Sequence, residues 1–277
     1  MKYLLYILYF FMFIYTVCAY DINQLNIGVW LSGASYCDKT KYNTMKIGGN
    51  ANEFIYNETL HDIITDVQGY IGIIPNMKSI YVVIRGSYSI RNWIDDFEII
   101  QTSYISYPEC NCNVHIGFYN SALSIRNKTL ETVKKLQNQF PLYSVVLTGH
   151  SYGASTVQML GMELEKENIH VKIYNYGQPR IGNKEYADFS NKIITEYWRT
   201  THNKDIVPHV PPKNIVSYNY SHSSTEIYED EIGILHQCSL TDGEDKTCSN
   251  KYKLSETNTI DHEYYLGHRV SCKESTI

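Results

Sequence analysis

The chain reads VVLTGHSYG at residues 145–153, and this stretch decides its fold. An apolar β-type run ends in Gly149-x-Ser151-x-Gly153, and a pattern with one apolar helical face follows at once. Strand, sharp turn and helix in this order are typical of a nucleophile elbow, which lifts one serine oxygen above a sheet edge. The turn is tight, and glycine fits it because it has no Cβ. The stretch therefore predicts Ser151 as a nucleophile.

Apolar runs alternate with helical patterns along the rest of the chain. Residues 171–176 and 194–201 are strand candidates, and residues 118–139 have mostly helical spacing. Residues 71–74 and 79–84 flank a turn signal and predict a hairpin. This alternation predicts an α/β fold with a mostly parallel central sheet.

The N-terminal residues 1–19 have the pattern of a secretory signal peptide. Lys2 supplies the positive start, residues 4–17 are almost wholly apolar, and residues 17–19 fit a small-residue cleavage site. The alternative is an uncleaved anchor, but the apolar run is short for a membrane span. Because no internal repeat or linker is visible, we expect residues 20–277 to form a single domain.

Composition excludes some classes of protein. The net charge of −5 argues against a nucleic-acid partner, which would require a basic surface. Cleavage after Ala19 would remove Cys18 and leave six of the seven cysteines, and an even number in an exported chain suggests disulfides. A zinc site is the alternative, which we disfavour because no Cys-x-x-Cys pair stands opposite a second pair. Glycosylation sequons at Asn57, Asn127 and Asn219 also fit export.

A serine nucleophile needs a base and a group that orients the base. Hydrolases with a nucleophile elbow place the acid after the serine and the histidine last in the chain. Asp205 lies in a polar turn just after a predicted strand, and His262 lies late in the chain beside apolar positions. Spacing alone leaves other residues in competition for these roles, namely Asp242, Asp261, His209 and His268.

Two backbone N–H groups are expected to form an oxyanion hole. One should come from Tyr152, the residue after the nucleophile, and the other from a loop after an earlier strand. Residues 82–87 end a strand in such a loop, and Gly86 permits a close backbone approach, so the Ser87 N–H is the second candidate.

A short amphipathic segment follows this loop. As a helix, it would place Ile90, Trp93 and Ile94 on one face, which could cover the site when closed and meet lipid when open. The alternative is an ordinary surface turn with one buried tryptophan.

Several ordered blocks resemble the class 3 lipases, the filamentous-fungal triacylglycerol lipase family, from about Cys37 to Cys272. The blocks lie at residues 85–93, 114–118, 149–153, 176–183, 202–212 and 261–265. The resemblance implies an α/β-hydrolase fold, with helices on both faces of the sheet, and a catalytic triad of Ser151, His262 and Asp205. It also implies the disulfides Cys37–Cys272, Cys238–Cys248 and Cys110–Cys112.

Two features depart from the family: Tyr152, and the pair Ala154-Ser155, which replaces the commoner Gly-Ala or Gly-Gly. Tyr152 stands where the family usually has leucine, which implies a reshaped acyl pocket. The backbone N–H is kept, so the resemblance still implies catalysis.

The sequence thus predicts a secreted serine ester hydrolase that acts on glycerides, without a metal or cofactor, in transient contact with a lipid–water interface. The alternatives are a phospholipase A1 or a feruloyl-type esterase on the same scaffold, or a catalytically inactive binding protein. No nucleic acid and no obligate protein partner is expected.

Overall fold

The structure is a computed structural model, which describes residues 20–89, 99–215 and 217–277. Two predictions fall outside these residues: the signal peptide at residues 1–19 and the lid with Ile90, Trp93 and Ile94. No helix in the described ranges combines the length and the apolarity that crossing a membrane requires.

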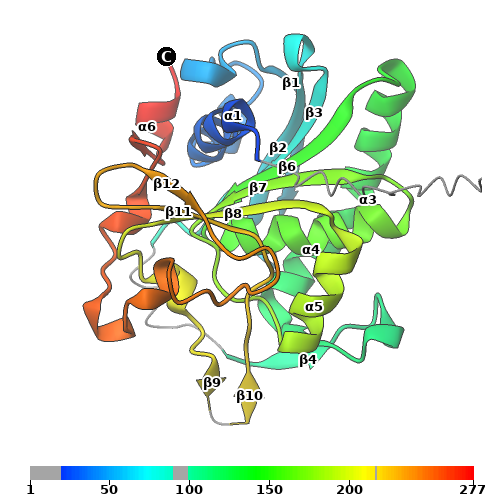
Figure 1. The fold of residues 1–277 in the computed structure, drawn as a ribbon. Helices are drawn as coiled ribbons and strands as arrows, with labels where there is room; N and C mark the ends of the chain where they lie inside the picture. The colour runs from blue at the N-terminus through cyan, green and yellow to red at the C-terminus, as the bar shows by residue number, and fades with distance from the viewer. Residues whose placement is uncertain (1–19, 90–98, 216) are drawn as a thin grey trace, which may run out of the picture.

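An eight-stranded sheet forms the centre of the described chain (Figure 1). Its strands lie in the order β1-β2-β3-β6-β7-β8-β11-β12. Neighbours from β3 to β11 are parallel, whereas β1, β2 and β12 extend the two sides with antiparallel pairs. The strands are β1 (Ile55–Asp62), β2 (Val67–Ile74), β3 (Ser79–Ile84), β6 (Ser144–His150), β7 (Val171–Tyr176), β8 (Glu196–His202), β11 (Glu226–Glu229) and β12 (Leu235–Gln237).

Helices cover both faces of this sheet. Figure 1 shows α1 on one side and α4 and α5 on the other. The helices are α1 (Ile22–Ala34), α3 (Ile116–Gln139), α4 (Tyr152–Lys166), α5 (Lys184–Ile193) and α6 (Cys272–Ser275). The predicted α/β-hydrolase arrangement is therefore confirmed, with a parallel centre and antiparallel edges.

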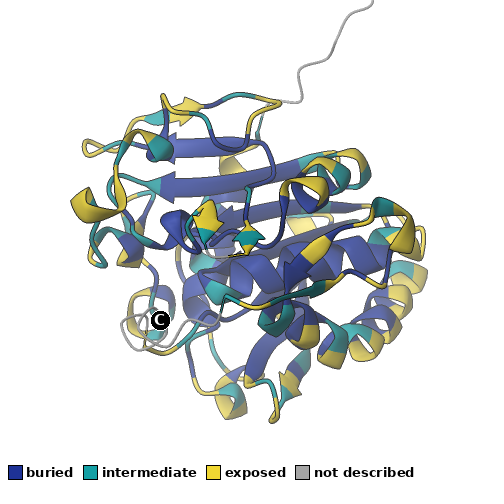
Figure 2. Cartoon of the chain, turned by 90° about the horizontal axis from the view of Figure 1, so that it is seen from below, coloured by how far each residue is buried: buried dark blue, intermediate teal, exposed yellow. Residues whose placement is uncertain are grey.

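Alternate residues of the central strands contribute to two separate hydrophobic cores, as the two-residue period of a strand requires. In β3, Ile80, Val82 and Ile84 pack with α3 and α4, whereas Tyr81 and Val83 pack with α1. Figure 2 shows the result, with buried central strands and helices exposed mainly on their outer sides.

The remaining elements are short. Three two-stranded ribbons lie outside the main sheet: β4 (Gln101–Ser103) with β5 (Asn113–His115), β9 (Asn214–Ile215) with β10 (Tyr218–Asn219), and β13 (Tyr264–Tyr265) with β14 (His268–Arg269). Single 3-10 turns occur at Lys39–Lys41, Gly49–Ala51, Pro75–Met77, Pro108–Cys110, Val207–His209, Ser249–Lys251, Leu254–Glu256 and Asp261–Glu263.

The predicted hairpin is confirmed as the antiparallel pair β2 and β3. Lys78 takes a left-handed conformation (φ 47°) at its turn. The structure also contains the three disulfides that the resemblance implies, Cys37–Cys272, Cys238–Cys248 and Cys110–Cys112.

Candidate active site

The elbow joins β6 to α4 through one residue. Ser151 has φ 59° and ψ −129°, a left-handed conformation that is uncommon for a residue with a side chain. The flanking glycines are needed for packing. A Cβ on Gly153 would lie 2.2 Å from the carbonyl oxygen of Ile84, and one on Gly149 would lie 2.7 Å from the Gly153 backbone. Strand, turn and helix therefore pack too closely here for any other residue.

The structure brings two distant predicted residues together. His262 Nδ1 lies 2.8 Å from Asp205 Oδ2, and both side chains are buried. Asp205 also accepts hydrogen bonds from the Val207 N–H, at 2.8 Å, and from the phenol of Tyr265. A buried carboxylate held in this way can fix the imidazole ring and stabilise its charged form.

The competing candidates occupy other environments. Asp261 accepts hydrogen bonds from Asn203, Lys204 and Asn258. The remaining competitors have contacts elsewhere: Asp242 accepts from the Glu244 N–H, His209 bonds to the backbone carbonyl of Asp205, and His268 stacks on Trp30. Of the candidates weighed from the sequence, Asp205 and His262 are the pair whose side chains meet.

Ser151 lies beside this pair. The ring of the adjacent His150 packs against the His262 ring, with centroids 4.3 Å apart. The Ser151 N–H donates to the backbone carbonyl of Tyr176, the residue before Gly177. A Cβ on Gly177 would lie 2.7 Å from His262 Cε1. Ser151 Oγ and His262 Nε2 are both buried, and neither makes a hydrogen bond to any described residue. A nucleophile and a base often come into hydrogen-bond contact only when substrate binds.

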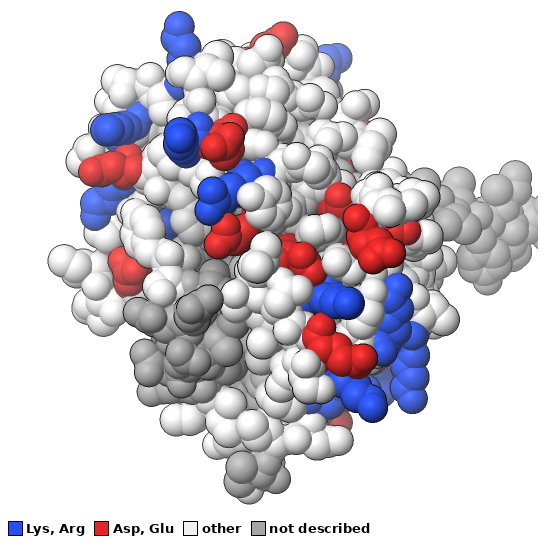
Figure 3. Space-filling model, turned by 90° about the vertical axis from the view of Figure 1, so that its left-hand side faces the viewer, with Lys and Arg blue, Asp and Glu red and all other residues white. Residues whose placement is uncertain are grey.

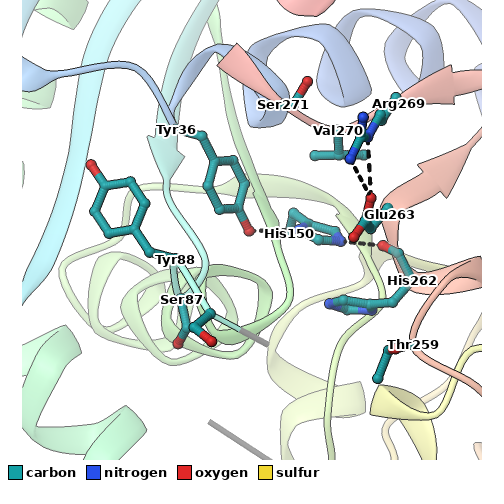
Figure 4. A pocket seen from close by; sticks show the side chains of 11 residues that line it. Tyr36, Ser87, Tyr88, His150, Thr259, His262, Glu263, Arg269, Val270 and Ser271 are labelled. Atoms are coloured by element: carbon teal, nitrogen blue, oxygen red, sulfur yellow. Dashed lines mark hydrogen bonds and ion pairs between the residues drawn. The ribbon is translucent and has the colours of Figure 1, made fainter. Parts of the chain in front are cut away.

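His150 links Tyr36 to the backbone of His262 (Figure 4). Burial, and then the nearby imidazole of His262, hold the pKa of His150 well below its usual value, so the ring is neutral. Its Nε2 lies 2.8 Å from the His262 carbonyl oxygen, which only accepts, so Nε2 carries the proton. The Tyr36 hydroxyl therefore donates to His150 Nδ1, at 2.7 Å.

The two oxyanion candidates flank the elbow. Tyr152 is the first residue of α4, where backbone N–H groups point out of the helix end. Ser87 follows Gly86, whose Cβ position would lie 2.7 Å from the His150 carbonyl oxygen and 2.9 Å from Ser151 Cβ. The predicted oxyanion loop is thus packed directly against Ser151.

The oxyanion loop is tied to its surroundings by Arg85. Its guanidinium donates to the carboxylate of Asp66 at 3.0 Å and lies over the Tyr88 ring, 3.9 Å from the centroid. Arg85 itself is buried. The side chain therefore links the loop to the turn between β1 and β2.

The phenol of Tyr152 is fixed at its far end. Its oxygen lies 2.7 Å from Ser121 Oγ and donates to the Gly117 carbonyl at 2.9 Å, and its ring packs edge-on against Phe118. Burial raises the pKa of Tyr152, so the phenol stays protonated. An aromatic ring thus stands in a fixed position where the family usually has leucine.

A cavity of about 390 Å³ opens beside His262 (Figure 4). Its lining is mixed: Tyr36, Ser87, Tyr88, Ser89, His150, Thr259, His262, Glu263, Arg269, Val270 and Ser271. Arg269 and Glu263 form an ion pair at its edge, with 2.7 Å between Nη2 and the carboxylate. Among the residues that the structure describes, no group of three or more His, Cys, Asp or Glu side chains could hold a metal ion.

Sequence reasoning missed Tyr36 and gave no role to His150 or Tyr265. Tyr36 and His150 are separated by 114 positions, so no local pattern joins them. Tyr265 was visible only as part of the block at residues 261–265. Tyr265 lies three residues after His262, and nothing in the local sequence indicates that its phenol reaches Asp205.

The fold, the elbow and the buried carboxylate–imidazole pair together define a class of protein, the serine hydrolases of the α/β-hydrolase fold. A family model described as Lipase (class 3) matches residues 81–215. A lipase from Rhizomucor miehei is 31% identical over 262 residues, which cover 89% of this chain and 69% of that protein. The chain belongs to the class 3 lipase family.

Further comparisons agree with this membership. The solved Rhizomucor miehei triacylglyceride lipase matches with a TM-score of 0.82 at 30% identity, covering 91% of this chain and 96% of that one. Another solved structure with the same score and identity is described as a triacylglycerol lipase whose catalytic centre is a serine protease triad. A secreted mono- and diacylglycerol lipase from Fusarium solani is 31% identical over 166 residues, 60% of this chain and 48% of that protein.

Proposed function

We propose that the chain is a secreted lipase that hydrolyses the carboxylic ester bonds of glycerides. The observation that carries the proposal is the buried hydrogen bond between His262 and Asp205, which lies beside the Ser151 elbow. Relatives described as triacylglyceride lipase and as mono- and diacylglycerol lipase support glycerides as the substrate class.

The reaction starts with attack of Ser151 Oγ on the ester carbonyl, while His262 Nε2 takes the proton. Asp205 holds the imidazole through Nδ1 and stabilises its positive charge. His262 then gives the proton to the departing glycerol oxygen, which leaves an acyl-enzyme. Water repeats the two steps, releases the fatty acid and restores Ser151.

The negative charge that develops on the carbonyl oxygen needs fixed donors. We assign this role to the backbone N–H groups of Ser87 and Tyr152. Tyr152 follows Ser151, and Ser87 follows Gly86, whose Cβ position lies 2.9 Å from Ser151 Cβ. The cavity beside His262 takes the alcohol part of the ester, and its mixed lining suits a glyceride with hydroxyl groups. This assignment also explains why the lining is not wholly apolar.

Secretion is supported by two independent features. Three disulfides are present in the structure, and such bonds persist in oxidising compartments. A relative is described as a secreted lipase. We therefore assign residues 1–19 as a signal peptide, residues 20–277 as the single mature domain, and a lipid–water interface as its place of action.

The face shown in Figure 3 fits an uncharged substrate. Basic and acidic side chains are interspersed among uncharged residues, without a large area of one sign. Phosphate-rich partners require such an area of positive charge. The charges on this face therefore favour a neutral lipid over nucleic acid.

The nucleophile is tested by Ser151→Ala, assayed on a dissolved short-chain ester and on emulsified triglyceride. We expect kcat to fall by about 10⁴-fold or more, because the residual rate comes from binding and the oxyanion hole alone. Ser155→Ala is the matched control, since Ser155 is a buried serine in the first turn of α4, and its hydroxyl donates to the Pro179 carbonyl at 3.3 Å. A fluorophosphonate should label the parent and the control, but not Ser151→Ala.

Two results would contradict the proposal. Hydrolysis retained by Ser151→Ala would place the nucleophile elsewhere. A parent enzyme that cleaves feruloyl esters or phospholipids, but neither triglyceride nor monoglyceride, would overturn the glyceride assignment.

A further inference from the structure

The turn between β1 and β2 contains two highly exposed isoleucines. Ile63 is 84% exposed and Ile64 is 90% exposed, the most exposed pair of adjacent apolar residues in the described chain. Turns usually contain Gly, Asn, Asp, Pro or Ser, because these residues satisfy turn geometry and solvation. Two exposed branched apolar side chains in a turn therefore indicate that the turn binds an apolar partner.

The turn is held rigidly. Asp62 accepts hydrogen bonds from both the N–H and the hydroxyl of Thr65, at 2.9 and 2.8 Å. Asp66 takes a left-handed conformation (φ 52°) and accepts from Arg85 through its carboxylate and its carbonyl. Both carboxylates are thus engaged by neighbours, and the two isoleucines form the outermost part of the turn.

Sheet topology places this turn at the catalytic edge. β2 is antiparallel to β3, with Gly69 opposite Ile84, so the start of β2 lies where β3 ends. β3 is parallel to β6, with Ile84 opposite Gly149, just before the elbow. The isoleucine turn, the oxyanion loop and Ser151 therefore share one edge of the sheet.

Contacts run from the turn to the cavity. Asp66 bonds to Arg85, and Arg85 stacks on Tyr88, which is 64% exposed and lines the cavity. Ile260, which is 69% exposed, follows Thr259, another residue of the cavity wall. An exposed aromatic ring thus lines the cavity, and an exposed isoleucine follows another residue of its wall.

From this arrangement we infer that Ile63 and Ile64 insert into a lipid surface and hold the catalytic edge against it. The inference rests on the proposed function, and it adds a docking point separate from the predicted lid. Two side chains are too few for a stable protein interface, which buries about 800 Å² on each partner. Insertion into lipid needs no matching partner surface, because it is driven by removal of apolar area from water.

The charge of the turn and of the whole chain indicates which kind of lipid surface the isoleucines bind. The turn carries Asp62 and Asp66, and the chain has a net charge of −5, so anionic lipid offers no attraction. A neutral surface of zwitterionic or uncharged lipid is the matching partner.

The test measures partition into phosphatidylcholine vesicles, with Ser151→Ala present in every protein to prevent hydrolysis. Adding Ile63→Ser and Ile64→Ser should lower the partition constant by about tenfold or more, because both side chains lose their apolar area. A second pair, Ile63→Thr and Ile64→Thr, keeps the branched shape and should show a smaller loss in the same direction. Leu142→Ser is the matched control, since Leu142 is 82% exposed and precedes the opposite end of β6.

Three outcomes would overturn the inference. The double variants could bind vesicles as well as the parent, or Leu142→Ser could lose as much binding as they do. Sedimentation could instead show that the parent self-associates through the turn and that the double variants are monomers. Because binding is measured on an inactive background, it stands apart from the proposed function, which fails separately if Ser151→Ala still hydrolyses ester.

Discussion

At the scale of single residues, the site is organised around two imidazoles with different tasks. His262 bonds to a carboxylate, which suits a ring that becomes charged during proton transfer. His150 is buried and neutral, and it bonds through both nitrogens, to Tyr36 and to the His262 backbone. A second charged ring 4.3 Å from His262 would oppose protonation of the base. Neutrality of His150 therefore favours the proposed chemistry.

Tyr36→Phe tests whether the hydrogen-bonded pair of Tyr36 and His150 positions His262. The change leaves His150 Nδ1 buried without a donor, so we expect the free energy of unfolding to fall by about 1–2 kcal/mol. Because the His262 backbone loses support, kcat on a dissolved ester should fall about five- to tenfold while KM stays the same. The measurements are urea unfolding and steady-state kinetics.

Tyr107→Phe is the control for this substitution. Tyr107 is buried, and its hydroxyl donates to the Met162 carbonyl at 2.8 Å in the other core. It should lose similar stability without a change in kcat. An equal fall of kcat in both variants would mean that Tyr36 acts only through general stability.

Individual site residues were predicted from the sequence where their role requires a recognisable local sequence pattern. The glycines around Ser151 mark an elbow because only glycine fits that packing. Asp205 and His262 needed the family resemblance, since four other residues competed by spacing. Tyr36 has no such pattern, because its partner His150 lies 114 positions away. The sequence also does not distinguish a hydrogen-bonded tyrosine from the other tyrosines among the 26 in the chain.

At the scale of elements, β3 and the elbow form one packed unit. The Gly153 Cβ position contacts the carbonyl of Ile84, and the Gly86 Cβ position contacts the elbow from the other side. The end of β3, the oxyanion loop and the start of α4 therefore cannot shift independently. This close packing holds the two proposed oxyanion donors at a fixed distance from the nucleophile.

Gly86→Ala should separate the donor from the nucleophile. The added Cβ would lie 2.2 Å from the Tyr36 hydroxyl and 2.7 Å from the His150 carbonyl, so the loop must move and carry the Ser87 N–H with it. Loss of one oxyanion donor lowers kcat by about 10²–10³-fold, and we expect a fall of that size in kcat/KM on a dissolved ester.

Gly267→Ala is the comparison for this variant. Gly267 has φ 69° and no atom within 4 Å of its Cβ position, so the change should cost about 1 kcal/mol of stability and leave kcat/KM unaltered. If Gly86→Ala keeps its kcat/KM within about threefold of the parent, the Ser87 N–H does not serve the oxyanion.

Elements were predicted from the sequence where they have a simple period. β6 is a short apolar run and α4 has one apolar face, so both stand out. The helix α1 was not anticipated, because it is buried on most sides, with Ile27, Gly28, Val29 and Leu31 all inside the core. A helix of this kind has no polar face and so lacks the amphipathic period. The strand β11 spans only Glu226–Glu229, too short to show alternation.

At the scale of the whole molecule, long-range contacts join segments that are distant in the sequence. The disulfide Cys37–Cys272 joins the residues after α1 to α6. Arg180 contacts two further segments: it donates to the backbone carbonyls of His209 and Pro211, at 2.8 and 2.9 Å, and to Glu244. One buried side chain, Arg180, thus connects the loop that follows Asp205 to the segment that contains Glu244.

The Arg180–Glu244 pair is bidentate and almost fully buried. Its two hydrogen bonds measure 2.7 and 2.8 Å, and Glu244 also accepts from the His222 N–H at 3.0 Å. Burial alone would raise the pKa of Glu244, but the hydrogen bonds and charge of Arg180 outweigh it, so the pKa lies below its usual 4.5. The ionised carboxylate therefore stabilises the folded state.

Glu244→Gln should destabilise the protein in a pH-dependent way. At pH 7 it leaves Arg180 buried without its counter-charge, which costs about 3–5 kcal/mol in the free energy of unfolding. Because the folded pKa is below the unfolded one, the parent has this stabilisation in full above about pH 4.5 and loses it as the pH falls through the folded pKa. Urea unfolding at several pH values should show the gap between parent and variant narrowing towards acid.

Asp188→Asn provides the contrast, because its ion pair with Lys184 is exposed on α5 and contributes about 0.5 kcal/mol at most. Other carboxylates protonate in the parent and in both variants, so the parent–variant difference isolates Glu244. A gap that widens towards acid, or a loss at pH 7 no larger than that of Asp188→Asn, would show that Glu244 is not the charge that holds Arg180.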